Sequence, residues 1–313
     1  MNPAIHTDKL RRRFGRTLAL DDVDIDIAAG AIYALVGANG AGKTTLIKLL
    51  MNIHKPTSGR AEVLGVDSRR LAGKAFQQIG YVSENQEMPE WMTMGMMLDY
   101  YRSFYPKWDR ALEQQLVRQF DLPLARKLKH VSRGQRMKAA FASSLAYRPP
   151  LIVLDEPFSG LDPLVRDELI EGLLDRAPET TIFLSSHDLA EIESFASHVG
   201  FLEQGRLLFS EELTELSERF RDVTVTLTTS ASLPAAIPNT WLQAQASDSV
   251  IRFIDSGYRR YVSERELAEI FPAARSFSCD PMPLRSIFLA IARSGRSRPA
   301  ATSLPTEVGR IEA

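Results

Sequence analysis

The chain has 313 residues, a length that accommodates one large domain or two modest ones. Hydrophobic residues make up 44% and charged residues 25% of it, which is typical of a globular protein with a real core and excludes a disordered or fibrous chain. Its 38 Lys and Arg nearly balance its 39 Asp and Glu, so the charge gives no electrostatic reason to expect nucleic acid or an anionic lipid surface as a partner.

The first clear pattern is a strand, a glycine loop and a helix in succession. Residues 31–36, AIYALV, form a short apolar run that ends at Gly37, as buried strands do, and residues 46–53, LIKLLMNI, have helical periodicity. Residues 79–83, IGYVS, form the next predicted strand. A long helical stretch follows over 92–147, interrupted by DLP and by the loop KHVSRGQ.

Two more buried strands are predicted at 151–155, LIVLD, and 181–186, TIFLSS, with a helix at 164–177 between them. Strands that alternate with helices favour a parallel sheet covered by helices. Residues 200–210 have a Gln-Gly turn between two apolar runs, which predicts a hairpin that closes this unit.

The composition changes near residue 220. Residues 222–229 and 250–254 have strand patterns, and residues 263–271 and 284–292 have amphipathic helical patterns. We therefore expect a first domain at 1–218 with a helical subdomain at about 85–147, a small α+β domain at 219–295, and a disordered tail rich in Ser, Pro, Gly and Arg at 296–313.

Cys279 is the single cysteine of the chain, which excludes an internal disulfide and a thiolate metal cluster and fits a reducing cytosol. We expect it to be a small buried hydrophobe rather than a nucleophile. No window approaches the roughly 20 apolar residues that a membrane-spanning helix needs, and the first residues lack a signal-peptide pattern. If the protein serves a membrane, we expect another chain to span it.

A phosphate-binding loop is predicted at residues 37–44, GANGAGKT, which match G-x-x-x-x-G-K-[ST] between a predicted strand and a predicted helix. Glycines let the backbone N–H groups point toward a phosphate chain, and the helix N-terminus adds positive potential. Lys43 would bridge the β- and γ-phosphates and Thr44 would bind Mg²⁺. A plain glycine turn is the structural alternative. A dinucleotide-binding loop is disfavoured because the spacing is G-x-x-G-x-G and the loop ends in Gly-Lys-Thr.

An acid pair, Asp155 and Glu156, lies at the C-terminal end of a predicted buried strand, where open α/β sheets bind ligands. Asp155 would hold Mg²⁺ through water, and Glu156 could take a proton from an attacking water. Acidic residues at strand ends are also common as surface polarity. Beside a phosphate loop, however, the pair favours phosphoryl chemistry.

Three further motifs accompany these two: residues 131–135, VSRGQ, residues 159–162, SGLD, and His187 in SSHD. With them the sequence resembles the ATP-binding-cassette ATPases over roughly residues 8–215, with the motifs of that family in the same order. The resemblance implies an α/β P-loop nucleotide-binding domain of that type with a helical signature subdomain, followed here by the small α+β domain.

The resemblance also implies roles for individual residues. Phe14 would stack on adenine, the signature loop would bind the γ-phosphate held by another subunit, residues 159–162 would communicate across the dimer, and His187 would contact the γ-phosphate. The implied catalytic residues are Lys43, Glu156 and His187, and the implied metal ligands are Thr44, Glu84 and Asp155. The residues expected to contact ATP or its metal are Phe14, Gly37, Asn39, Gly40, Ala41, Gly42, Lys43, Thr44, Thr45, Glu84, Ser132, Gly134, Gln135, Asp155 and Asp162.

Each motif outside the phosphate loop and acid pair has a structural alternative. His187 can be a satisfied structural histidine, Phe14 a core residue and Glu84 merely solvated. Ser132 and Gln135 can form an ordinary helix cap, a geometry that also leaves N–H groups available for a phosphate.

The sequence departs from the family pattern at three positions. Glu84 stands where the family typically has glutamine, and a carboxylate can reach a metal or its water but cannot donate amide hydrogen bonds. In the signature, Val131 replaces leucine and Arg133 replaces the first glycine. Ser132 and Gly134 are kept, so phosphate binding by this loop can be kept too.

The resemblance implies an ATP-binding and hydrolysing subunit of a transporter, with ATP and Mg²⁺ as cofactors. It would pair head-to-tail with a second copy or a homologous subunit around two MgATP, and drive a separate integral membrane permease of the exporter type from the cytoplasmic face of the membrane. No nucleic-acid partner is expected. The alternatives are a soluble cassette ATPase acting on ribosomes or DNA, and a P-loop kinase or GTPase, in which VSRGQ, SGLD and SSHD would have no role.

Residues 88–97 contain five of the nine methionines of the chain. Methionine-rich surfaces adapt to partner helices, so we expect this segment, next to Glu84, to receive a loop of a membrane subunit. The alternative, a gap-filling role in the core of the helical subdomain, is equally compatible with the sequence.

Overall fold

The computed structural model describes residues 3–84 and 86–296, and it divides into two compact units between Thr214 and Glu215. The composition shift places this division after residue 218, four residues later. Residues 297–313 of the expected tail lie outside the described residues. Within the described part, no helix is long and apolar enough to cross a membrane.

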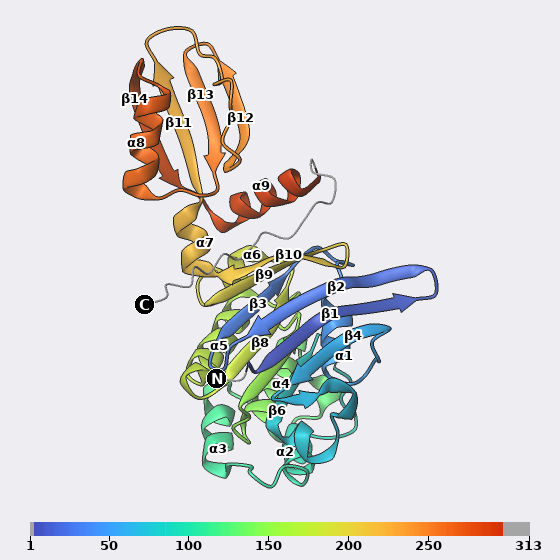
Figure 1. Ribbon diagram of the computed structural model, residues 1–313. Helices are drawn as coiled ribbons and strands as arrows, with labels where there is room; N and C mark the ends of the chain where they lie inside the picture. Colours follow the sequence, from blue (N-terminus) through green and yellow to red (C-terminus); the bar gives the residue numbers. More distant parts are fainter. Residues whose placement is uncertain (1–2, 85, 297–313) are drawn as a thin grey trace, which may run out of the picture. The chain divides into compact units, whose positions relative to one another are not determined.

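A six-stranded sheet forms the centre of the first unit (Figure 1), in the order β10-β9-β3-β8-β7-β6. Strands β3, β6, β7, β8 and β9 are parallel, and β10 pairs with β9 in the antiparallel sense. The strands are β3 (Ile32–Val36), β6 (Ile79–Ser83), β7 (Leu151–Asp155), β8 (Thr181–Ser186), β9 (His198–Glu203) and β10 (Arg206–Glu212). Every residue of β3, β7 and β8 is buried, as expected for apolar strands covered on both faces. The predicted alternation of strands and helices is therefore confirmed.

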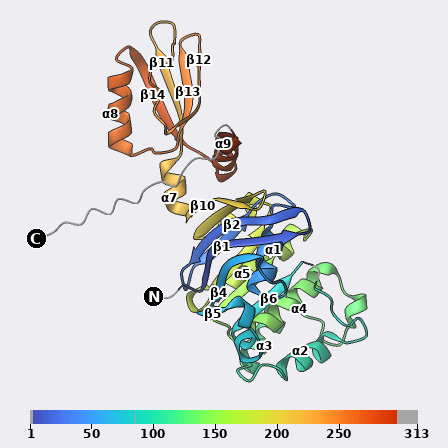
Figure 2. The same ribbon diagram turned by 45° about the vertical axis from the view of Figure 1, so that its right-hand side comes forward.

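Some helices of the first unit pack on this sheet, and others form a separate helical group (Figure 2). The helices are α1 (Lys43–Leu50), α2 (Met94–Arg102), α3 (Arg110–Gln119), α4 (Arg133–Leu145), α5 (Pro163–Leu174) and α6 (Leu189–Ile192), and α7 (Leu213–Arg219) spans the boundary between the units. Short 3₁₀ turns are at Ser68–Arg70, Gly73–Gln78, Leu128–His130 and Ala177–Glu179. Helices α2, α3 and α4 gather at one end of the first unit.

The predicted helical stretch at 92–147 consists of three helices. Both predicted interruptions fall between α3 and α4, and the additional break at 103–109 was not predicted. Asp109 ends the additional break because its carboxylate accepts hydrogen bonds from the backbone N–H groups of Ala111 and Leu112 and caps α3. Ser132 caps α4 in the same way. Local capping residues thus divide a stretch whose apolar periodicity is nearly continuous.

A second, antiparallel sheet in the order β2-β1-β4-β5 was not predicted. Its strands are β1 (Ile5–Phe14), β2 (Thr17–Ile27), β4 (Ser58–Val63) and β5 (Val66–Asp67). Its inward side chains, including Ile5, Leu20 and Ile25, pack with Leu35 of β3 and Leu46 of α1 in one buried core. The phosphate loop between β3 and α1 is therefore anchored at both ends in one buried apolar cluster.

The second unit is an antiparallel sheet in the order β12-β13-β11-β14 with helix α8 (Figure 1). Its elements are β11 (Arg221–Leu227), β12 (Trp241–Ser247), β13 (Val250–Asp255), α8 (Arg260–Ile270), β14 (Ala274–Pro281) and α9 (Leu284–Arg296). Val223, Ile251 and Phe253 from the sheet pack with Leu267 of α8. Cys279, on β14, is partly buried, and this burial raises the pKa of its thiol, which disfavours a nucleophilic role.

Candidate active site

Two glycines of the phosphate loop, Gly37 and Gly42, could not be replaced by another residue without a clash. A Cβ on Gly37 would come within 2.2 Å of the carbonyl oxygen of Leu202. Gly42 has φ +113°, a left-handed conformation, and a Cβ there would come within 2.7 Å of the carbonyl oxygen of Ala19. Gly42 is the N-cap of α1 and has no side chain to satisfy the first N–H groups of the helix. These N–H groups are therefore available to an anion.

The Lys43 side chain is almost fully buried and lies across this loop. Its Nζ donates hydrogen bonds to the carbonyl oxygens of Gly37, at 2.6 Å, and Ala38, at 3.2 Å. The same nitrogen is 3.0 Å from Oε1 of Glu156. A phosphate in the loop would thus meet a cation already fixed in position by the loop's own backbone.

Asp155 is buried at the end of β7 and is held by two hydroxyl groups. Its Oδ1 accepts hydrogen bonds from Thr44 Oγ1 on α1, at 3.0 Å, and from Ser185 Oγ on β8, at 2.8 Å. Burial raises the pKa of Asp155, and these two hydrogen bonds oppose that shift. The residue therefore carries a desolvated carboxylate close to the helix that follows the phosphate loop.

Glu156 has φ +51°, an uncommon left-handed conformation for a residue other than glycine. Its backbone N–H donates to Ser185 Oγ at 2.9 Å. Its carboxylate lies between two partners, because Oε2 is 2.7 Å from Nδ1 of His187 and Oε1 faces Lys43. His187 is partly exposed, and its hydrogen-bond partner is the Glu156 carboxylate.

Ser185 is a site residue that belongs to the SSHD motif, but the motif suggested no role for it. It occupies the position opposite Asp155 in the parallel pairing of β7 and β8, and its hydroxyl contacts both members of the acid pair. A serine among the buried apolar residues of TIFLSS was the available signal, because a buried hydroxyl needs a hydrogen-bond partner.

The predicted residues separate into a group that shares one cavity and a group that does not. A cavity of about 380 Å³ is lined by the predicted residues Asn39, Gly40, Gly42, Lys43, Thr44, Thr45, Glu84 and Glu156, together with Thr17, Leu18, Ala19, Gln204 and Gly205. Gly37 and Ala41 belong to the same loop without lining the cavity, and Asp155 accepts a hydrogen bond from Thr44. The phosphate loop and the acid pair are thus brought together.

The signature residues do not line this cavity. Ser132 and Gln135 form a capping box at the start of α4, with Ser132 Oγ accepting from Gln135 N–H at 3.2 Å. Gly134 packs against Val165, and Asp162 caps α5 by accepting a hydrogen bond from the N–H of Val165 at 3.1 Å. Among the described residues, therefore, no member of 131–135 lines the phosphate-loop cavity.

Phe14 ends β1 and is 41% exposed, so it is not the core residue that the sequence left open as an alternative. The Arg12 guanidinium lies 4.3 Å from the centre of its ring, and the His54 ring meets it edge-on at 5.4 Å. The ring is thus supported by its neighbours while much of its surface is free, which a stacking role requires.

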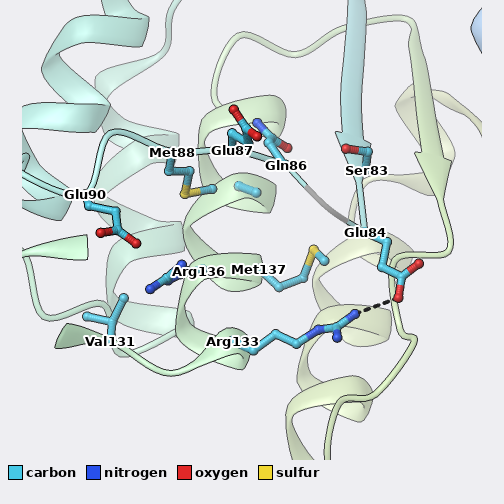
Figure 3. Close-up of a pocket in the computed structure, with 11 residues that line it drawn as sticks. Ser83, Glu84, Gln86, Glu87, Met88, Glu90, Val131, Arg133, Arg136 and Met137 are labelled. Atoms are coloured by element: carbon cyan, nitrogen blue, oxygen red, sulfur yellow. Dashed lines mark hydrogen bonds and ion pairs between the residues drawn. The ribbon is translucent and has the colours of Figure 1, made fainter. Parts of the chain in front are cut away.

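A second cavity, of about 780 Å³, lies between the segment that follows β6 and the start of α4 (Figure 3). Its lining residues are Ser83, Glu84, Gln86, Glu87, Met88, Glu90, Val131, Arg133, Arg136, Met137 and Ala140. In Figure 3 the Glu84 carboxylate points toward the Arg133 guanidinium, and Oε1 of Glu84 is 2.9 Å from Nη2 of Arg133. Two of the three substituted positions of the family pattern are therefore in direct contact.

The protein groups beside the phosphate loop fit a magnesium ion that is shared with a nucleotide. Mg²⁺ prefers oxygen ligands and is usually held by one or two carboxylates together with substrate phosphates and waters. Thr44 and Asp155 supply a hydroxyl and a carboxylate, and Glu84 lies in the same cavity with its backbone N–H bonded to the carbonyl oxygen of Asp155 at 2.8 Å. Within the described ranges, no group of three or more His, Cys, Asp or Glu could hold a metal by itself.

These features define a P-loop nucleoside triphosphatase: a parallel sheet, an anion-binding glycine loop with a buried lysine, and an acid pair at the end of β7, which β8 separates from β3. The sequence profile of the ABC transporter family matches residues 20–159. The chain belongs to the ATP-binding proteins of this family, which excludes the kinase or GTPase alternative, and it is an ATPase.

Individual relatives agree with this assignment. The ABC transporter ATP-binding protein YtrB of Bacillus subtilis is 31% identical over 231 residues, which cover 73% of this chain and 79% of YtrB. The bacitracin transport ATP-binding protein BcrA of Bacillus licheniformis is 31% identical over 239 residues, which cover 71% of this chain and 74% of BcrA. A solved ATP-binding subunit of an ABC transporter superposes with a TM-score of 0.63 at 28% identity, and covers 68% of this chain and 91% of that structure.

Replacement of Asp155 by Asn tests whether the negative charge of Asp155 increases MgATP affinity while it lowers the stability of the nucleotide-free protein. Asn keeps an oxygen that can accept from Thr44 and Ser185 but removes the buried charge. Because the folded-state pKa of Asp155 is raised, the ionised group disfavours folding at neutral pH and ceases to do so once acid protonates it. The melting temperature of nucleotide-free Asp155→Asn should therefore rise by roughly 2–4 °C, the shift that ~1 kcal/mol produces in a unit of this size, and the gain should fade as the pH falls.

The same variant should bind MgATP at least about tenfold more weakly, a typical cost of disturbing a metal site. Calorimetric melting over a range of pH and titration with MgATP give the two quantities. A variant that is less stable than the wild type at neutral pH would show that the carboxylate is a structural group.

Proposed function

We propose that this ATPase works as a head-to-tail pair of copies, or with a homologous subunit, and closes around two MgATP. One observation supports this most directly: the phosphate-loop cavity is lined by Lys43, Thr44 and Glu156 but, among the described residues, by no member of the signature loop 131–135. A second chain would then supply the signature N–H groups, including those at the Ser132 cap of α4, to the phosphates bound by the first.

In this pair, Glu156 is the general base and His187 holds its carboxylate. Lys43 and the free N–H groups of α1 bind the phosphate chain, so the Glu156 carboxylate lies next to the bound triphosphate. There it can accept a proton from a water that attacks the γ-phosphate. Thr44, Asp155 and Glu84 would hold Mg²⁺, whose charge would neutralise that of the phosphates.

The partner that this cycle drives is, we propose, an integral membrane permease of the exporter type. The relative BcrA takes part in bacitracin transport, which supports a transporter of this class. The protein would then act on the cytoplasmic face of the membrane. The balanced charge of the chain and its single cassette give no support to a ribosome- or DNA-directed ATPase.

Glu156→Gln should bind MgATP with nearly unchanged affinity but hydrolyse it about 10²–10⁴-fold more slowly, the usual contribution of a general base. The glutamine keeps the size of the side chain and can still contact His187, but it cannot take the proton. If two copies share each site, MgATP should also convert this variant to a long-lived dimer, as measured by sedimentation.

Glu171→Gln provides a matched control, because this carboxylate is exposed on α5, outside both cavities. It should hydrolyse at the wild-type rate and form no stable dimer. Hydrolysis at the wild-type rate by Glu156→Gln would remove Glu156 from the mechanism. A strictly monomeric Glu156→Gln that turns over ATP would contradict the paired arrangement.

The cavity between the β6 segment and α4 is, we propose, where the permease docks. The structure divides the methionines of the segment at 88–97: Met92, Met94 and Met97 are buried in the helical group, whereas Met88 lines the cavity and Met96 is exposed. Trp91, in the same segment, is 63% exposed. Part of this segment therefore fills the core, and its other large side chains are available to a partner.

Alanine at both Met88 and Trp91 should reduce co-purification with a permease by at least about tenfold, because exposed aromatic side chains often dominate interfaces. The nucleotide affinity and melting temperature of the ATPase should be nearly unchanged. Tyr261→Ala, which removes an 81% exposed aromatic ring from the second unit, is the control and should leave co-purification intact. Equal recovery of the permease with the double variant would exclude this docking surface.

A further inference from the structure

Glu84 is, among the described residues, the one that lines both cavities. Its backbone N–H donates to the carbonyl oxygen of Asp155 at 2.8 Å, which fixes its main chain beside the acid pair. Its carboxylate nevertheless lies 2.9 Å from Nη2 of Arg133, on the side of the larger cavity (Figure 3). The direction of this one side chain therefore decides which cavity receives the negative charge.

Arg133 is held in place at the first turn of α4. The preceding residue, Ser132, caps this helix, and the following residue, Gly134, packs so closely on Val165 that an added Cβ would be 3.1 Å from it. The Arg133 guanidinium also lies against Gly160, where an added Cβ would be 3.3 Å from Nη1. Its position beside Glu84 thus follows from the packing of three segments.

We propose that Arg133 is a positioning residue that competes with the metal ion for the Glu84 carboxylate. This proposal rests on the MgATP site described under the proposed function. While Arg133 donates to the carboxylate, Oε1 of Glu84 is occupied by the guanidinium. For this oxygen to bind a metal ion beside Thr44 and the phosphate loop, the pair with Arg133 has to open.

The strength of the competition follows from the exposure of the pair. The side chains of Arg133 and Glu84 are 48% and 33% exposed, so water and salt screen their attraction. The pair therefore lowers the apparent metal affinity without abolishing it. Removal of the guanidinium should tighten metal binding by about two- to fivefold, the range that exposed ion pairs typically produce.

The test is the binding of Mn²⁺ to the full chain with a bound non-hydrolysable ATP analogue, followed by electron paramagnetic resonance of the free ion. Arg133→Ala and Arg133→Gln should each lower the half-saturating Mn²⁺ concentration by about two- to fivefold at low salt, and the difference should shrink at high salt. Arg133→Lys keeps a cation and should stay near the wild type. In a Glu84→Gln background, Arg133→Ala should leave the half-saturating Mn²⁺ concentration unchanged, because the carboxylate for which Arg133 and the metal compete is absent.

The melting temperature of each variant shows whether it is folded, and the Gln and Lys variants at position 133 keep the long side chain that packs against Gly160. An unchanged Mn²⁺ affinity in folded Arg133→Gln would overturn the proposal. So would a shift of equal size in the Glu84→Gln background, since Arg133 would then act through some other group. A wild-type chain that binds the analogue with no dependence on Mn²⁺ would contradict the proposed MgATP site itself and the competition with it.

Discussion

The buried carboxylate of Asp155 is the constraint on which the catalytic end of the first unit depends. Burial raises the pKa of this group, so its ionised form is disfavoured unless polar partners surround it. Thr44 on α1 and Ser185 on β8 provide these partners, and their hydrogen bonds tie the helix after the phosphate loop to the end of the sheet. Ser185 also accepts the N–H of Glu156, so one hydroxyl orients both acids. The negative charge of Asp155 lowers the stability of the nucleotide-free protein, but a cation needs this charge as a ligand. Binding of a cation can therefore restore the folding free energy that the buried charge costs.

The sequence predicted the strands of the parallel sheet but not those of the antiparallel sheet β2-β1-β4-β5, and the difference has a physical reason. Strands such as β7 are buried on both faces and so consist almost entirely of apolar residues. In β1 a register shift between Thr7 and Leu10 separates the inward residues Ile5 and Leu10, and charged side chains occupy the outward positions. These irregularities remove the strict alternation by which a half-buried strand is predicted.

The same distinction applies to the site. The phosphate loop is one continuous segment of the sequence, and so is the acid pair. The residue spacing within each segment therefore predicted Lys43, Thr44, Asp155 and Glu156 as neighbours of a nucleotide. One cavity is lined by phosphate-loop residues and by Glu156. Ser185 depends on the register between two strands, and the Glu84–Arg133 pair joins residues 49 positions apart. Contacts of this kind arise only when elements pack, and no local spacing encodes them.

The partial exposure of the Glu84–Arg133 pair makes it suitable for coupling the two cavities. A fully buried ion pair would cost several kcal/mol to open, because each charge would be left without a partner, and such a pair would act as a lock. An exposed pair contributes only about 0.2–1 kcal/mol, so a ligand on either side can displace it. Linkage requires the effect to be reciprocal: a group that binds Arg133 from the larger cavity frees Glu84 for the nucleotide site by the same factor by which a ligand of Glu84 frees Arg133. An occupant of the larger cavity can thus alter metal affinity without any rearrangement of the phosphate loop.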